Sequence, residues 1–292
     1  MVAKPDQMPE RHKVLITGAG GMLGEALTLE LKKANEVSGI DIGECDITDR
    51  DKTVEVLSGA KPDIVIHAAA WTDVDGCELD SEKAYRVNSD GTENVALACK
   101  ACGAVLIYIS TDFVFDGKKK APYKESDRPN PLSVYADSKL KGEDAVKRIL
   151  ERYFILRTSW LYGSHGKNFV DTILARAKPE GVLKVVDDQT GSPTYTKDLA
   201  GAIYMLLKKI FGGYGTYHIT NSGHVSWYGY AREILRLAKS TAKVVPISSD
   251  ELNRPARRPA MSILDNTKFI RFTGFKMRHW REALGDYLFQ PG

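Results

Sequence analysis

The sequence predicts an α/β protein built on a doubly wound parallel sheet, with a smaller part towards the C-terminal end. Short apolar strands alternate with helical patterns from residue 14 onward. Segment 63–68 carries the uninterrupted apolar run Ile64-Val65-Ile66, which is typical of a parallel strand covered by helices on both faces. A glycine-rich turn joins the first strand to the first helix. This regularity weakens beyond about residue 165, which predicts the smaller part.

The predicted elements follow one another in strict order. The strands cover residues 14–17, 36–41, 63–68, 105–110, 153–158, 183–186 and 216–219. The helices cover residues 22–34, a short segment ending near 57, 81–102, a segment beginning near 133, 197–209, 227–239 and 280–289. In a sheet of this kind ligands bind at the carboxyl ends of the strands, so side chains at those ends are candidates for a site.

The first strand ends in a three-glycine fingerprint. Gly18 permits the sharp turn, Gly21 allows the backbone to approach a pyrophosphate, and Gly24 allows the helix to pack closely on the strand. The amides at the start of the helix then face an anion. The predicted cofactor contacts in this segment are Gly18, Gly20, Gly21, Met22, Leu23 and Gly24. The Rossmann-type fold and a bound dinucleotide are the interpretation that this pattern favours.

Two further strand ends fit a dinucleotide. Asp41 ends the second strand, where an acidic residue would hold the adenosine ribose, although an ordinary strand-end carboxylate is the alternative. The small side chains of Ala68, Ala69 and Ala70 end the third strand and would let a cofactor pass close, and tight helix packing explains them equally well. A carboxylate repels a 2′-phosphate, so Asp41 favours NADH, while NADPH stays open.

Composition limits the class of protein. The chain has 292 residues and a net charge of +3 from well interspersed charges, which gives no argument for a nucleic-acid partner. No apolar run is long enough to span a membrane, and the polar first residues do not resemble a signal peptide. Cys99 and Cys102 have the spacing of a redox or metal half-site, but they lie in a helical pattern without a second pair. We expect buried thiols and a cytoplasmic protein.

The domain organisation follows from the element pattern. We expect a flexible tail over residues 1–11 and a dinucleotide-binding domain over 12–165, to which 190–220 returns. The segments 166–189 and 221–292 would form a substrate-binding domain.

A second constellation carries chemistry. Tyr135 and Lys139 are four residues apart on one predicted helix and share a face. An ammonium group near the phenol would lower the pKa of Tyr135 and make it a usable acid or base for a carbonyl–alcohol pair. Thr111, at the end of the fourth strand, can hydrogen-bond the same carbonyl oxygen. Lys139 would also reach the nicotinamide ribose. A tyrosine–lysine pair with this spacing is usually a surface pair. Because it follows a glycine fingerprint and a strand that ends in Ser110-Thr111, we interpret it as part of an active site.

These motifs together resemble a known family. The fingerprint, Thr111 and the pair Tyr135 and Lys139 are similar to those of the extended short-chain dehydrogenase/reductases. Further segments resemble the dTDP-4-dehydrorhamnose reductase family along nearly the whole chain: 110–117 (STDFVFDG), 157–163 (RTSWLYG), 188–194 (DQTGSPT) and Arg258-Pro259. The resemblance implies reduction of the 4-keto group of dTDP-4-dehydro-L-rhamnose to dTDP-L-rhamnose, with NADH or NADPH as cofactor.

The resemblance also implies roles for single residues. Tyr135 would protonate the keto oxygen, and Thr111 would orient it. The sugar pocket would be lined by Asp112, Phe113 and Trp160, with Gln189 and Thr194 in a nearby loop. Arg258, or else Arg257, would meet the substrate's diphosphate. Asp46 and Ile47 would flank the adenine, and Asn88 is more consistent with a structural role. A glutamate linked to magnesium in some members is Ala26 here, so no metal is expected, and a homodimer is possible in such a family.

Two other functions stay open. A nucleotide-sugar dehydratase would need an acidic pair after the threonine, and here Asp112 is followed by Phe113. An epimerase would lack the segment 113–117. A regulatory binding subunit resembling the beta subunit of methionine adenosyltransferase is the alternative outside enzymology. The intact Thr111, Tyr135 and Lys139 favour catalysis over that role.

Overall fold

A six-stranded parallel sheet forms the centre of the molecule in the computed structural model, which describes residues 11–179 and 181–289. Its strand order is β10-β5-β4-β3-β1-β2. The bounds are β1 Lys13–Thr17, β2 Glu36–Ile40, β3 Ile64–His67, β4 Val105–Thr111, β5 Tyr153–Thr158 and β10 Gly215–His218. The strand order reverses between β1 and β3, which is the switch point where such sheets bind ligands. The predicted fold class is confirmed.

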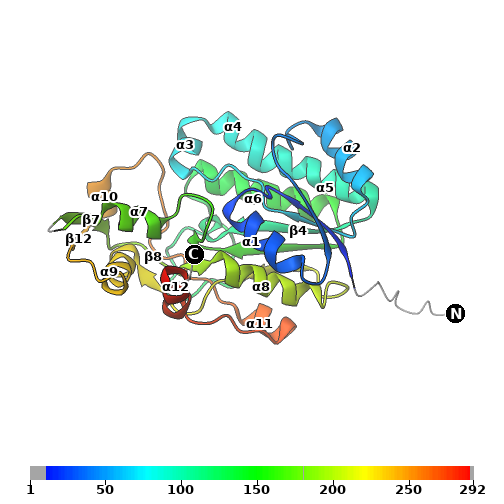
Figure 1. The fold of residues 1–292 in the computed structure, drawn as a ribbon. Helices are drawn as coiled ribbons and strands as arrows, with labels where there is room; N and C mark the ends of the chain where they lie inside the picture. Colours follow the sequence, from blue (N-terminus) through cyan, green and yellow to red (C-terminus); the bar gives the residue numbers. More distant parts are fainter. Residues whose placement is uncertain (1–10, 180, 290–292) are drawn as a thin grey trace.

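Helices cover both faces of this sheet (Figure 1). Helices α1 (Met22–Leu31) and α8 (Thr196–Leu207) pack on one face, where Leu27, Ile203 and Leu206 are fully buried against the strands. The other face is covered by α2 (Arg50–Ala60), α5 (Gly91–Cys102) and α6 (Val134–Ile149). Strands β3 and β4 are buried along their whole length, as the apolar run Ile64-Val65-Ile66 predicted for β3.

The long helix predicted over residues 81–102 is continuous but not uniform. It consists of α4 (Ser81–Tyr85), a π-helical turn η1 (Arg86–Asp90) and α5. A further short helix, α3 (Val74–Leu79), precedes it and was not predicted. Asp73 caps α3 through its side chain, so a polar segment without an apolar stripe forms a helix there.

A smaller part lies beside the carboxyl ends of the sheet strands (Figure 1). Strands β7 (Val182–Val186) and β12 (Lys243–Ile247) form a parallel pair, packed with α7 (Phe169–Arg176), α9 (Trp227–Leu237) and α12 (Trp280–Phe289). Strand β12 was missed because Pro246 interrupts a five-residue run. The remaining short elements are η2 Asp112–Val114, β6 Leu161–Tyr162, β8 Thr190–Gly191, β9 Thr194–Tyr195, β11 Val225–Ser226, α10 Ser249–Leu252 and α11 Thr267–Thr273.

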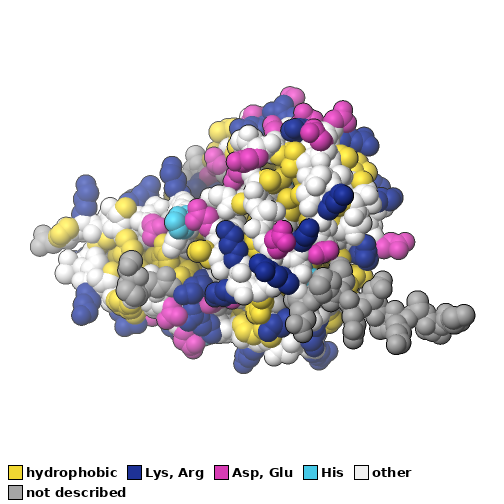
Figure 2. All heavy atoms as spheres, turned by 45° about the vertical axis from the view of Figure 1, so that its right-hand side comes forward, with side chains coloured by type: hydrophobic (Ala, Val, Ile, Leu, Met, Phe, Trp, Pro, Cys, Tyr) yellow, Lys and Arg dark blue, Asp and Glu magenta, His cyan; other side chains and the backbone are white. Residues whose placement is uncertain are grey.

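The predicted domain boundaries stay a prediction, but the two returning elements lie with the larger part. Helix α8 and strand β10 belong to the main sheet and its cover, and Phe269 of α11 is buried in the same core. The predicted tail, apart from Arg11, lies outside the described residues. On the face drawn in Figure 2, acidic and basic side chains are interspersed. In the described part of the chain, no helix is long and apolar enough to cross a membrane.

Candidate active site

The turn between β1 and α1 has the shape that its glycines predicted. Gly18 has a φ of +71°, and a Cβ there would lie 2.7 Å from the backbone nitrogen of Ala69. A Cβ at Gly24 would lie 2.1 Å from the carbonyl oxygen of Gly18. Both positions therefore exclude a side chain. Helix α1 begins at Met22 without a side-chain cap, so its first amides are available to an anion. The turn fits a dinucleotide pyrophosphate.

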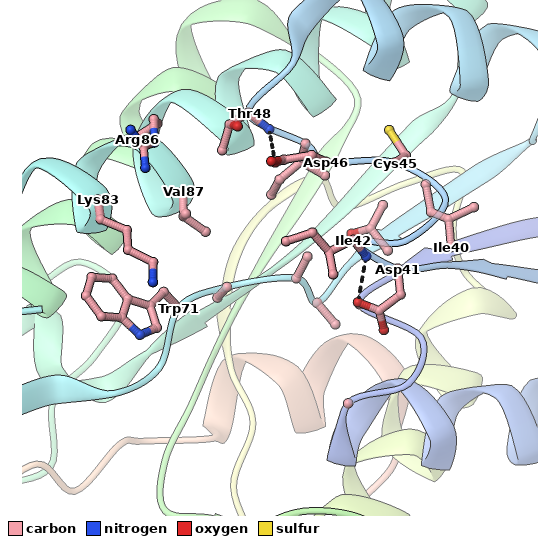
Figure 3. Close-up of a pocket in the computed structure, with 17 residues that line it drawn as sticks. Ile40, Asp41, Ile42, Cys45, Asp46, Thr48, Trp71, Lys83, Arg86 and Val87 are labelled. Atoms are coloured by element: carbon pink, nitrogen blue, oxygen red, sulfur yellow. Dashed lines mark hydrogen bonds between the residues drawn. The ribbon is translucent and has the colours of Figure 1, made fainter. Parts of the chain in front are cut away.

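A cavity of about 710 Å³ adjoins this turn and holds most of the predicted adenosine contacts (Figure 3). Gly18, Gly21, Asp41, Asp46, Ile47 and Ala68 to Ala70 all line it. Both oxygens of the Asp41 carboxylate accept backbone hydrogen bonds of 2.9 Å, one from Gly20 and one from Ile42. Asp41 is thereby fixed at the edge of the cavity, beside the glycine turn, where a ribose would lie.

Three lining residues of this cavity, Lys83, Arg86 and Val87, were not predicted. Trp71 also lines the cavity, and the Lys83 ammonium lies 4.4 Å from the centre of the Trp71 ring (Figure 3). The Asn88 side chain fixes the backbone of Trp71: it accepts from the Trp71 backbone N–H at 2.9 Å and donates to the Trp71 carbonyl at 3.1 Å. The structural role expected for Asn88 is thus observed. Residues 83, 86 and 87 share a helical face, a spacing that could have revealed them.

A second cavity, of about 420 Å³, contains the three predicted catalytic residues, and we call it the reaction cavity. Thr111, Tyr135 and Lys139 line it together with Gly18 and Gly21, which also line the adenosine cavity. Met22, Leu23 and Gly24 lie along the same wall. The two cavities therefore meet at the glycine turn, so that a dinucleotide can extend from Asp41 to Tyr135.

The electrostatics of Tyr135 and Lys139, the predicted catalytic pair, differ from the prediction. Burial raises the pKa of Tyr135 well above its usual value, and the hydrogen bond with Thr111 offsets only part of that shift. Burial lowers the pKa of Lys139 to about 7, while the Glu143 carboxylate raises it in part. The expected lowering of the Tyr135 pKa by Lys139 was wrong, because the Lys139 ammonium donates to the carbonyl of Ile109 at 2.8 Å and burial of the phenol dominates.

A buried ionic network lies directly beneath this pair and was not predicted. Glu143 and Arg157, fully buried side chains, form two hydrogen bonds of 2.8 and 2.6 Å. Ser110 donates to the same carboxylate at 2.6 Å. Burial raises the pKa of Glu143, but the hydrogen bonds and charge of Arg157 outweigh it and hold that pKa well below the usual value. The network fixes helix α6 against the ends of β4 and β5. Its signal in the sequence, one glutamate four residues after Lys139, is too common to be decisive.

Three of the residues predicted for the sugar pocket line the reaction cavity. These are Asp112, Phe113 and Trp160. Asp112 accepts from the Thr111 hydroxyl at 3.1 Å, and burial raises its pKa to about 7. Trp160 stacks on Trp227, with ring centres 3.5 Å apart. Trp227 was missed because it comes from α9, more than sixty residues further along the chain, and no local pattern links the two rings.

A third cavity, of about 500 Å³, continues from the reaction cavity into the smaller part, and we call it the arginine cavity. Arg254 and Arg258 line it, whereas the alternative Arg257 does not. Both arginines are held by Asp75 of α3: Arg254 bonds it at 2.9 Å, and Arg258 bonds it at 3.0 and 2.9 Å. The guanidinium of Arg258, which was predicted to meet a diphosphate, is therefore already bonded to the Asp75 carboxylate.

Two predicted loop residues lie outside these cavities. Gln189 donates to the hydroxyl of Ser249 at 2.8 Å and lines none of the three cavities. Thr194 is fully buried and donates to the carbonyl of Ser192 at 3.2 Å. Gln189 thus joins the loop after β7 to α10, and the hydrogen bond of Thr194 lies within its own loop. A substrate contact for Gln189 stays a prediction, without support from its position.

The parallel sheet, the glycine turn and the Thr111–Tyr135–Lys139 cavity define a nicotinamide-dependent oxidoreductase of the extended short-chain dehydrogenase/reductase type. A family model described as the RmlD substrate binding domain matches residues 12–290. The chain belongs to the dTDP-4-dehydrorhamnose reductase family, as its motifs predicted.

Relatives and solved structures agree with this assignment. The spore coat polysaccharide biosynthesis protein SpsK of Bacillus subtilis is 42% identical over 277 residues, covering 94% of this chain and 96% of that protein. The dTDP-4-dehydrorhamnose reductase of Aggregatibacter actinomycetemcomitans is 40% identical over 284 residues, covering 93% of this chain and 97% of that protein. The dTDP-4-dehydrorhamnose reductase of Bacillus anthracis, solved in complex with NADP, superimposes with a TM-score of 0.92 at 40% identity and covers 96% of this chain and 100% of that chain. A UDP-glucose 4-epimerase of Thermus thermophilus shares the fold alone, with a TM-score of 0.81 at 20% identity over 94% of this chain and 97% of that chain.

Proposed function

We propose that this protein reduces the 4-keto group of dTDP-4-dehydro-L-rhamnose to dTDP-L-rhamnose with NADH or NADPH. The observation that carries the proposal is the reaction cavity, which Thr111, Tyr135 and Lys139 line together with the glycine turn. Membership of the reductase family supports the same substrate. The glycine turn, Asp41 and Ala68 to Ala70 would hold the dinucleotide, which supplies a hydride equivalent when it is bound.

The chain's own residues supply the proton and the orientation. The raised pKa of Tyr135 keeps its phenol protonated at neutral pH, so the phenol can donate a proton to the keto oxygen as that oxygen gains charge. The Thr111 hydroxyl orients the same oxygen by a hydrogen bond. Lys139 lies on the same helix face, and its hydrogen bond to the carbonyl of Ile109 fixes this part of α6 against β4. The keto group thus becomes a secondary alcohol.

The alternative functions lack a matching residue. A dehydratase needs a second acidic residue beside Asp112, and the reaction cavity has the aromatic ring of Phe113 in that place. Epimerases share the fold with this chain, and a shared fold does not assign an activity. A purely regulatory subunit would have no need for the buried Lys139 and its supporting ion pair.

Turnover of the keto sugar tests the proposal. We expect rapid oxidation of NADH or NADPH by the wild-type protein with dTDP-4-dehydro-L-rhamnose, followed by the absorbance of the reduced nicotinamide. Tyr135→Phe removes the donated proton and should lower kcat by about 10³-fold. Tyr204→Phe, on helix α8 and outside the three cavities, should leave kcat unchanged. Absence of turnover with both coenzymes would overturn the proposal. The ratio of the two coenzymes' kcat/KM values tests the preference for NADH predicted from Asp41.

We further propose that segments 12–165 and 190–220 bind the coenzyme while 166–189 and 221–292 bind the substrate. A cytoplasmic location is supported by four cysteines that are all free thiols, as expected in a reducing compartment. A homodimer and the absence of a nucleic-acid partner stay predictions, which a measurement of molar mass with and without added nucleic acid would test.

A further inference from the structure

The reaction cavity and the arginine cavity adjoin each other and share six lining residues, which we call the junction. Both cavities are lined by Thr72, Val74, Trp160, Leu161, Lys167 and Trp227. The reaction cavity adds the glycine turn and the catalytic residues, and the arginine cavity adds residues of α3, α7 and the loop that carries Arg254 and Arg258. A ligand that occupies both cavities must pass this junction.

A nucleoside diphosphate sugar has its diphosphate between its two ends. On the proposed function, on which this inference rests, the reacting sugar lies beside Tyr135, so the nucleoside extends towards the arginine cavity. The diphosphate therefore crosses the junction. Of the six junction residues, Lys167 alone is charged.

The nearby arginines are less available than Lys167. Asp75 accepts hydrogen bonds from Arg254, Arg258 and the backbone of Ala256, and one Arg258 nitrogen also donates to the carbonyl of Ala256. Within the described part of the chain, no hydrogen bond or ion pair engages the Lys167 ammonium. We propose that Lys167 binds the diphosphate of the nucleotide-sugar substrate and thereby selects a diphosphate-linked sugar.

The loop that carries Lys167 is anchored at both ends and against α1. Asn168 donates to the carbonyl of Gly163 at 3.0 Å and caps α7 by accepting from the backbone of Asp171. His165 pairs with Glu25 of α1 at 3.0 Å. These contacts bring the loop near the glycine turn, so the coenzyme pyrophosphate is the other anion that Lys167 could meet. Because Lys167 also lines the arginine cavity, which contains no residue of the glycine turn, we assign it to the substrate.

Inhibition by dTDP and by thymidine separates the diphosphate from the rest of the nucleoside. Lys167→Gln should raise the inhibition constant of dTDP and the KM of the keto sugar about tenfold, the cost of one charge-assisted contact. The inhibition constant of thymidine, the KM of NADPH and kcat should stay within twofold of wild type. Lys167→Arg should restore most of the dTDP affinity. Lys184→Gln, an exposed lysine of β7 outside the three cavities, is the matched control and should behave as wild type.

Each other result overturns the assignment. Unchanged dTDP inhibition in Lys167→Gln would leave the diphosphate to other residues. A raised KM for NADPH in place of the dTDP effect would assign Lys167 to the coenzyme, and an equal loss for thymidine would indicate a distorted pocket. If the wild-type protein fails to reduce the keto sugar, the proposed function falls, and dTDP binding measured by quenching of tryptophan fluorescence near Trp160 and Trp227 still tests Lys167 separately.

Discussion

The side of the site proposed to bind the coenzyme and the side proposed to bind the substrate are built in different ways. On the proposed coenzyme side, the lining residues come from consecutive strand ends of one parallel sheet, and the supporting polar groups are buried. Glu143 and Arg157 lie beneath the catalytic pair, with exposed side-chain fractions of 0% and 2%. On the side proposed to bind the substrate, Asp75 binds Arg254 and Arg258 closer to solvent, with exposed side-chain fractions of 23% for Asp75, 14% for Arg258 and 52% for Arg254.

This difference teaches where the molecule is rigid and where it can adapt. A buried ion pair cannot lose one partner without leaving an unpaired charge in a poorly polarisable interior. An exposed ion pair can exchange its partner for water or for a ligand at little cost. We infer that the catalytic geometry is fixed before a substrate arrives, while the nucleotide end of the substrate is met by groups that can rearrange.

The largest effect is expected on the coenzyme side. Glu143→Gln leaves the buried guanidinium of Arg157 without its counter-charge and should destabilise the fold by about 3–5 kcal/mol. For a chain of this size, that corresponds to a fall in Tm of about 8 °C. Thermal unfolding followed by circular dichroism measures it.

A surface pair provides the control for this prediction. Glu93 binds Arg148 at 2.8 Å, and both side chains are exposed. Glu93→Gln should change Tm by less than about 2 °C, since exposed pairs contribute at most about 1 kcal/mol. Equal shifts for the two variants would refute the distinction between buried and exposed networks.

The same comparison explains how much the sequence could predict. The prediction that Gly18, Asp41, Ala68 and Thr111 lie close together follows from a parallel sheet, which brings successive strand ends to one edge, and all four line the first two cavities. Tyr135 and Lys139 were found because four-residue spacing on a helix is local. The contact of Lys83 with Trp71 escaped, because it joins the strand-end segment to helix α4 across the unpredicted helix α3.

The substrate side was less predictable because its contacts are long-range. The stack of Trp160 on Trp227 and the bonds from Asp75 to Arg258 join segments 67 and 183 residues apart, which no local pattern records. Arg258 lines the arginine cavity, as its place in the sequence suggested. Its guanidinium is nevertheless bonded to Asp75, which the sequence did not show. The pKa of Tyr135 was mispredicted for a related reason, since burial depends on the packing of several segments around the ring.

A pH-dependent effect of intermediate size is expected at Lys139. Burial lowers the pKa of Lys139 to about 7 in the folded protein, against about 10.4 for an unfolded chain. Between these values the unfolded state binds more protons, so this lysine makes the free energy of unfolding rise with pH, by about 1.4 kcal/mol per pH unit. Lys139→Met lacks this contribution. Its Tm relative to wild type should therefore be highest at pH 7 and fall at pH 8 and 9.

The neighbouring helix position gives the matched control. Lys141 lies on the same helix, and its side chain is 55% exposed. Lys141→Met should differ from wild type by an amount that does not change between pH 7 and pH 9. A pH-independent difference for Lys139→Met as well would mean that its ammonium is not desolvated in the folded protein.

The smallest effect is expected from the substrate-side ion pair. Asp75→Asn should lower Tm by less than about 2 °C, because Asp75 and Arg254 remain in contact with solvent. Burial raises the pKa of Asp75, but the hydrogen bonds and charge of Arg258 and the hydrogen bonds from Ala256 and Arg254 outweigh it and hold that pKa below its usual value, so the carboxylate is ionised throughout the neutral range. Salt should screen the contact of Asp75 with the exposed Arg254 and reduce the Tm difference between Asp75→Asn and wild type at 0.5 M sodium chloride. The difference between Glu143→Gln and wild type should persist there, because the buried pair excludes salt. If the Tm difference between Asp75→Asn and wild type does not change with salt, the contacts of Asp75 behave like the buried Glu143–Arg157 pair. The inference that the groups on this side rearrange around a ligand would then be contradicted.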